Sequence, residues 1–129
     1  MTLWNRILDL LFPPRCAFCG KLLGAGETDI CHTCGRDLPE IDDAHAVRRG
    51  AFGRCAVSFW YEDMVRDGIH GLKFGGRRGT AAVFARYMAE TVAAHFAGEF
   101  DLVTYVPVSA KRLRSRGYDQ SRLDRKAHV

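Results

Sequence analysis

Apolar positions repeat with two different periods along the chain, and each period predicts a different type of secondary structure. The clearest stripe repeats at every fourth residue and consists of Phe84, Met88, Val92 and Phe96. This spacing predicts an amphipathic helix over residues 80–97, with Gly98 just beyond its end. A shorter helix is expected over residues 64–72, ahead of the glycines of the segment KFGGRRG.

Another helical pattern lies at the N-terminus, in the segment 1–14. Its apolar side chains are Trp4, Ile7, Leu8 and Leu11. They predict a short amphipathic helix over residues 2–12, which two prolines end. Because Arg6 and Asp9 interrupt the apolar run, the segment resembles neither a signal peptide nor a membrane span.

Strand patterns lie on both sides of the long helix. An alternation of apolar and polar residues predicts a strand over residues 55–63, and the apolar run DLVTYVPV at 101–108 predicts a buried strand. Strand, helix and strand in this order predict one crossover of an α/β sheet. We therefore expect an α/β domain over residues 54–129, after a linker at residues 41–53.

Residues 15–40 contain too few large apolar side chains to form a core, so another force must order them. Their two Cys-x-x-Cys pairs are Cys16 with Cys19 and Cys31 with Cys34. Two such pairs can surround one ion with four thiolates, which predicts a zinc ribbon whose metal affinity contributes folding free energy. A closed four-thiolate shell has no open position, so the zinc is expected to be structural. Buried thiols or a redox pair are the alternatives.

The remaining residues near the ribbon have simpler interpretations. Gly20 and Gly35 follow the two pairs and are expected to supply backbone freedom there. We expect His32 to be a solvated side chain and Cys55 to be a small buried hydrophobe. The five cysteines are an odd number, which argues against a disulfide framework and favours a reducing, cytoplasmic setting.

The net charge of +4 is mild, but seven of the 19 basic residues fall into two clusters, at 73–78 and 111–116. The second cluster follows the predicted strand, at the edge where α/β proteins bind ligands. Its candidate residues for binding phosphate or pyrophosphate are Lys111, Arg112, Arg114, Arg116 and the flexible Gly117. A solvated basic surface is the alternative interpretation.

The order of these segments resembles the ComF family, the competence protein F-like phosphoribosyltransferases with an N-terminal double zinc ribbon. The resemblance covers nearly the whole chain: the cysteine ribbon, then LKFGGRRG, then VPVSAKRLRSRGYDQ. The cysteine pattern and PVSAKRLRSRGYDQ are its most specific pieces. The chain departs from the family pattern at Ser109, where proline is frequent, and at Asp119, where asparagine is usual.

This resemblance implies that the zinc ribbon precedes the first part of a type I phosphoribosyltransferase fold. It implies phosphoribosyl pyrophosphate as the ligand, facing Lys73 and the segment 111–120, with Mg²⁺ alongside it in a full-length form. It also implies a link to DNA uptake, with DNA or proteins of the competence machinery as partners.

The family's Asp-Asp-Val-x-Thr-Thr-Gly loop, which holds the 5-phosphate and the ribose, does not occur in these 129 residues. We therefore interpret the chain as C-terminally truncated and catalytically incomplete, and we assign no catalytic residue. The alternative function is a zinc-ribbon binding module that engages nucleic acid or a protein partner through its basic segments.

Overall fold

The computed structural model describes residue 11 and residues 13–51 and 53–126. The predicted helix over residues 2–12 therefore lies, apart from Leu11, outside the described residues. None of the described helices has the length and apolar character that crossing a membrane requires. In chain order the elements are α2 (His32–Arg36), α3 (Asp43–Ala46), β1 (Val47–Gly50), β2 (Gly53–Ala56), α4 (Asp63–Phe74), α5 (Thr80–Phe96), α6 (Ala110–Arg116) and α7 (Gln120–Lys126).

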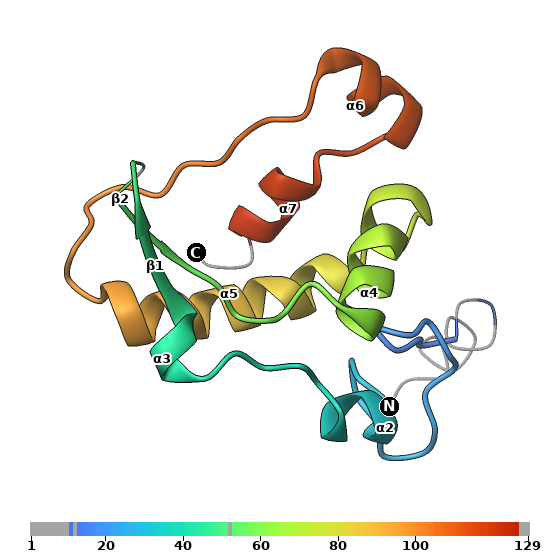
Figure 1. Ribbon diagram of the computed structural model, residues 1–129. Helices are drawn as coiled ribbons and strands as arrows, with labels where there is room; N and C mark the ends of the chain where they lie inside the picture. The colour runs from blue at the N-terminus through green and yellow to red at the C-terminus, as the bar shows by residue number, and fades with distance from the viewer. Residues whose placement is uncertain (1–10, 12, 52, 127–129) are drawn as a thin grey trace.

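The long helix α5 runs through the middle of the molecule, and shorter elements are arranged around it (Figure 1). α5 and α4 confirm the helices predicted over residues 80–97 and 64–72. α5 contacts α4, α7 and β2. Arg54 of β2 contacts the C-terminal end of α5. Its guanidinium donates to the main-chain oxygen of His95 at 2.7 Å and lies 4.7 Å from the centre of the Phe96 ring.

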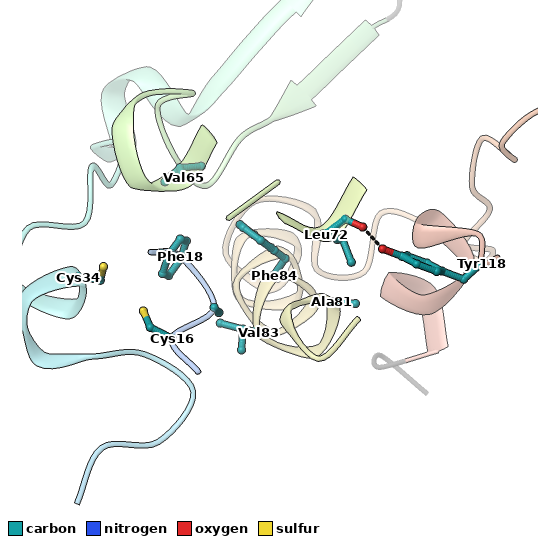
Figure 2. Close-up of a cluster of buried hydrophobic side chains, with 10 residues drawn as sticks. Cys16, Phe18, Cys34, Val65, Leu72, Ala81, Val83, Phe84 and Tyr118 are labelled. Carbon is teal, nitrogen blue, oxygen red and sulfur yellow. Dashed lines mark hydrogen bonds between the residues drawn. The ribbon is translucent and has the colours of Figure 1, made fainter. Parts of the chain in front are cut away.

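The core lies between the ribbon and the first turns of α5. Phe18 of the ribbon is fully buried, and its ring meets the Phe84 ring edge-on at a centroid distance of 5.4 Å. Figure 2 shows the buried side chains as a cluster that extends from Cys16 and Cys34 past the two phenylalanines to Tyr118. The ribbon is thus part of the core and not a separate lobe.

The apolar stripe of α5 is buried only near its N-terminal end. Phe84 is 8% exposed, whereas Met88 is 48% exposed and Val92 is 36% exposed. The helical period therefore locates the helix correctly, but it does not indicate how far along the helix the core extends.

The strand predicted over residues 55–63 is mostly wrong. β2 ends at Ala56 and pairs antiparallel with β1, and beyond it only Phe59 forms an isolated bridge, with Glu40. The amide of Val57 still donates to the carbonyl oxygen of Ala46 at 3.0 Å, but Ala46 belongs to α3, so the pairing of β1 and β2 ends there, and α4 begins at Asp63. Residues 41–53, interpreted as a linker, contain α3 and β1.

The strand predicted over residues 101–108 is also wrong, and with it the α/β crossover. Within the described residues the sheet consists of β1 and β2 alone, so this segment has no strand partner. Its apolar side chains are largely exposed, with Leu102 at 83% and Val106 at 84%. A strand forms only where a neighbour supplies main-chain hydrogen bonds. The fold is a ribbon followed by a mostly helical region with one small two-stranded sheet.

Candidate metal centre and basic pocket

The first Cys-x-x-Cys pair lies on a tight turn, residues 15–22, which we call the first knuckle. The amide of Cys16 donates to the carbonyl oxygen of Lys21 at 2.8 Å, and the amide of Gly20 donates to that of Cys16 at 3.0 Å. Gly20 has a φ of +75°, a conformation that side chains with a Cβ rarely adopt. The predicted need for glycine after this pair is confirmed.

The second pair lies at the start of α2. Cys31 is the residue before the helix, Cys34 is within it, and the amide of Gly35 donates to the carbonyl oxygen of Cys31 at 2.9 Å. Gly35 is helical and a Cβ there would meet open space. The predicted need for glycine after the second pair is therefore wrong, since the helix itself turns the chain.

The two pairs bring four sulfur atoms together, from Cys16, Cys19, Cys31 and Cys34. All four Sγ atoms lie within 4.8 Å of one another, and those of Cys19 and Cys31 are 3.7 Å apart. A tetrahedron with Zn–S bonds of 2.3 Å has sulfur–sulfur edges of about 3.8 Å. The donor set and its spacing therefore fit one tetrahedral zinc ion, with no position left for a substrate.

Burial and neighbouring groups shift the thiol pKa values of the cluster. Burial, followed by the neighbouring thiols, raises the pKa of Cys34, and burial also raises that of Cys19. At Cys16 burial opposes ionisation, but amides of the cluster outweigh it and lower the pKa from 9.0 to about 7. A bound metal ion would stabilise the thiolate forms by balancing their charge.

A glutamate fixes the segment between the two knuckles. The Glu27 carboxylate accepts from the amide of Gly24 and from the amide of His32, each at 2.6 Å. These backbone hydrogen bonds hold the pKa of Glu27 below its ordinary value of 4.5. His32 itself is exposed and outside the sulfur cluster, which confirms the prediction of a solvated side chain.

Cys55 is exposed, so the prediction that it is a small buried hydrophobe is wrong. Residues alternate between the two faces of β2, and Arg54 and Ala56 occupy the face that is partly buried. Cys55 therefore lies on the opposite face, which no described element covers.

The predicted basic loop over residues 111–116 is in fact helix α6. The Ser109 hydroxyl caps it by accepting from the amide of Arg112, at 3.4 Å. Gly117 ends it with a φ of +78°, and its amide donates to the carbonyl oxygen of Leu113 at 2.8 Å. Ser109 thus begins the helix and Gly117 ends it, and Gly117 does not line the pocket that α6 shares with α4.

A pocket of about 330 Å³ is lined by residues of α6 and of the C-terminal end of α4, and we call it the basic pocket. It is lined by Lys73, Phe74, Gly76, Arg112, Ser115, Arg116 and Tyr118. Three of the predicted ligand-binding residues, Lys73, Arg112 and Arg116, thus share one concave surface. Lys111 and Arg114 are exposed on α6 and do not line it.

Tyr118 is the residue that joins the two sides of the basic pocket. It is 7% exposed, and its hydroxyl donates to the main-chain oxygen of Leu72 in α4. The Arg116 guanidinium lies 5.4 Å from the Phe74 ring, which adds a second contact between the sides. This role for Tyr118 is not predicted from the sequence. An aromatic residue directly after a glycine in a polar segment is a pattern that could have indicated a buried contact.

Comparisons with known proteins agree with the metal centre. Residues 7–51 match the family model of the double zinc ribbon domain. No curated protein and no solved structure matches the chain. The N-terminal part of the chain is therefore a double zinc ribbon domain, and its four clustered cysteines form a structural zinc site.

Proposed function

We propose that this double zinc ribbon protein binds pyrophosphate, or the pyrophosphate group of phosphoribosyl pyrophosphate, in the basic pocket. One observation carries the proposal: the same pocket is lined by cations from two helices that are far apart in sequence. These cations are Lys73 of α4 and Arg112 and Arg116 of α6. Two guanidinium groups can each donate paired hydrogen bonds to phosphate oxygens, and the lysine adds a point charge.

One cation of the basic pocket, Arg116, is held in place by the protein. It contacts the side chain of Gln120 and the Phe74 ring, and α6 is capped at both ends. A donor that is preorganised in this way loses less conformational entropy when it binds an anion. Arg112, in the same pocket, is exposed to solvent.

The proposed ligand is the one point at which the basic pocket agrees with the resemblance to the ComF family. The motifs LKFGGRRG and VPVSAKRLRSRGYDQ supply its residues, and they are the motifs that resemble the family. A phosphoribosyltransferase-type domain and a link to DNA uptake rest on that resemblance. Transfer chemistry is not part of the proposal for these residues.

The test is a calorimetric titration of the zinc-loaded chain with pyrophosphate and with phosphoribosyl pyrophosphate, each in excess Mg²⁺. We expect saturable binding, and Arg112→Ala should weaken it by about tenfold or more, as loss of a hydrogen bond to a charged group costs roughly 1.5–3 kcal/mol. Arg49→Ala on β1, an exposed arginine away from α6, is the charge-matched control and should bind as the wild type does. Zinc content is measured before and after, because free pyrophosphate binds divalent metals.

Two results would contradict the proposal. If the zinc-loaded chain does not bind pyrophosphate, the proposed function is wrong. Equal losses in Arg112→Ala and Arg49→Ala would mean that overall positive charge, and not the basic pocket, attracts the anion. Binding of duplex DNA that weakens steeply with salt, together with no pyrophosphate binding, would instead favour the zinc-ribbon binding module.

A further inference from the structure

The turn between α4 and α5, residues 75–79, lies between the zinc ribbon and the basic pocket. We call it the glycine-arginine turn, after its sequence GGRRG. Its two arginines are neighbours in sequence but make contacts in different directions. Arg77 reaches the first knuckle, and Arg78 reaches Tyr118 at the basic pocket.

Arg77 connects the turn to the first knuckle. Its guanidinium donates to the main-chain oxygen of Phe18 at 3.3 Å and to that of Asp67 in α4 at 2.6 Å. Phe18 lies between two of the zinc ligands in sequence, so its carbonyl is positioned by the metal site. The amide of Arg77 also donates to the carbonyl oxygen of Gly71 at 3.1 Å, which closes the turn onto α4.

The opposite side of the turn belongs to the basic pocket. Gly76 is part of the pocket lining. The Arg78 guanidinium lies 4.6 Å from the centre of the Tyr118 ring, within the range of a cation–π interaction. Tyr118, two residues beyond the end of α6, also donates to the main-chain oxygen of Leu72 in α4. Tyr118 thus contacts both the turn and α4, and these contacts fix the end of α6 beside them.

The local sequence makes room for Arg77. A Cβ added at Gly71 would lie 1.9 Å from the Arg77 Nε and Nη2 atoms, and one at Gly20 would lie 2.7 Å from Nη1. The arginine therefore fits only because both the helix and the first knuckle have glycine where it passes. Gly71 has no positive φ, so its lack of a side chain serves this close approach.

We propose that Arg77 is a positioning residue, which ties the glycine-arginine turn to the zinc ribbon and thereby sets the geometry of the basic pocket. Arg77 does not line the basic pocket, and it acts through Arg78 and Gly76. The effect on ligand affinity rests on the proposed pyrophosphate binding, whereas the effect on the turn itself does not.

Two variants of the zinc-loaded 129-residue chain test this proposal. Arg77→Ala removes the hydrogen bonds of the guanidinium to Phe18 and Asp67. Gly71→Ala displaces the same guanidinium but changes neither residue 77 nor any residue that lines the pocket. In both we expect faster hydrogen exchange of the amides of residues 75–79 and about fivefold or greater weakening of pyrophosphate binding, the lower range of typical coupling between sites. The spectrum of the Co²⁺-substituted protein should remain that of a four-thiolate site.

A matched control and an internal reference separate positioning from general destabilisation. Arg66→Ala removes an exposed arginine of α4 that does not line the basic pocket, and it should change neither the exchange of the turn nor the affinity. Amides in the middle of α5 should exchange at the wild-type rate in all variants. Faster exchange throughout α5 would mean that Arg77 stabilises the whole fold, which would overturn a positioning role.

The remaining outcomes also decide between the proposals. Wild-type exchange and wild-type affinity in both Arg77→Ala and Gly71→Ala would overturn the role of Arg77. If the wild type fails to bind pyrophosphate but the turn of both variants exchanges faster, the proposed function fails while the positioning of the turn stands.

Discussion

Phe18 lies between two zinc ligands in sequence and at the centre of the core in space. Its ring meets those of Phe84, Phe59 and Tyr87 at centroid distances of 5.4, 6.0 and 6.4 Å. Buried aromatic rings contribute large apolar areas and favour edge-on contacts, as Phe18 makes with Phe84 and Phe59. A residue of the metal module thus supplies the apolar side chain on which the helices pack.

This packing depends on a glycine on the opposite side, and it gives the first prediction. A Cβ at Gly68 would lie 2.9 Å from the Phe84 ring and 3.1 Å from the main-chain oxygen of Ala17. Because the oxygen cannot move without the knuckle, Gly68→Ala should lower the free energy of unfolding by about 1–3 kcal/mol. Urea unfolding at a fixed excess of zinc measures it.

Gly79→Ala is the matched control. A Cβ there would meet nothing within 4 Å, and the φ of −60° suits any residue. Its free energy of unfolding should stay the same or rise by up to about 1 kcal/mol, since alanine restricts the unfolded chain. Equal effects of the two substitutions would show that α4 does not approach the knuckle as closely as described.

Elements that depend on local sequence were predictable, and those that depend on distant partners were not. The helical stripe of α5 and the two cysteine pairs are local patterns, and both were found where the sequence places them. The segment 101–108 has the composition of a strand, but composition does not supply a neighbour for pairing. Ser109 and Gly117 could have indicated α6, because they are residue types that begin and end helices.

The connection between the two knuckles should respond to acid through Glu27. Its pKa is lowered in the folded state by hydrogen bonds from the amides of Gly24 and His32. A lowered pKa contributes stability that is present above the ordinary value of 4.5 and is lost as the pH falls through the folded-state value. We expect the carboxyl carbon of Glu27 to titrate below pH 4.5 in NMR spectra of the zinc-loaded chain.

The prediction is specific to the two amide hydrogen bonds that the Glu27 carboxylate accepts. If Glu27 titrates at or above its ordinary value, its carboxylate does not hold the two amides in solution.

At the scale of the whole molecule, the metal site, the core and the basic pocket form one continuous series of contacts. The cysteines hold the first knuckle, the knuckle places Phe18 against α5, and Arg77 links the knuckle to the turn beside the basic pocket. The ribbon residues were predictable from cysteine spacing. The gathering of Lys73 with part of the basic cluster was implied only by the resemblance to the ComF family. The roles of Arg77 and Tyr118 were not predictable, because each depends on a main-chain oxygen supplied by a distant segment.

The central claim is that a four-cysteine zinc site orders the core, and the zinc content of Cys31→Ser beside Cys55→Ser tests it most directly. Cys55 lies outside the cluster and is exposed, so its variant should keep one zinc ion per chain and the native near-ultraviolet circular dichroism of the aromatic core. Cys31→Ser should lose the zinc and that signal together, because metal affinity contributes folding free energy. A Cys31→Ser chain with full zinc content, or one without zinc that retains the native aromatic signal, would contradict the claim.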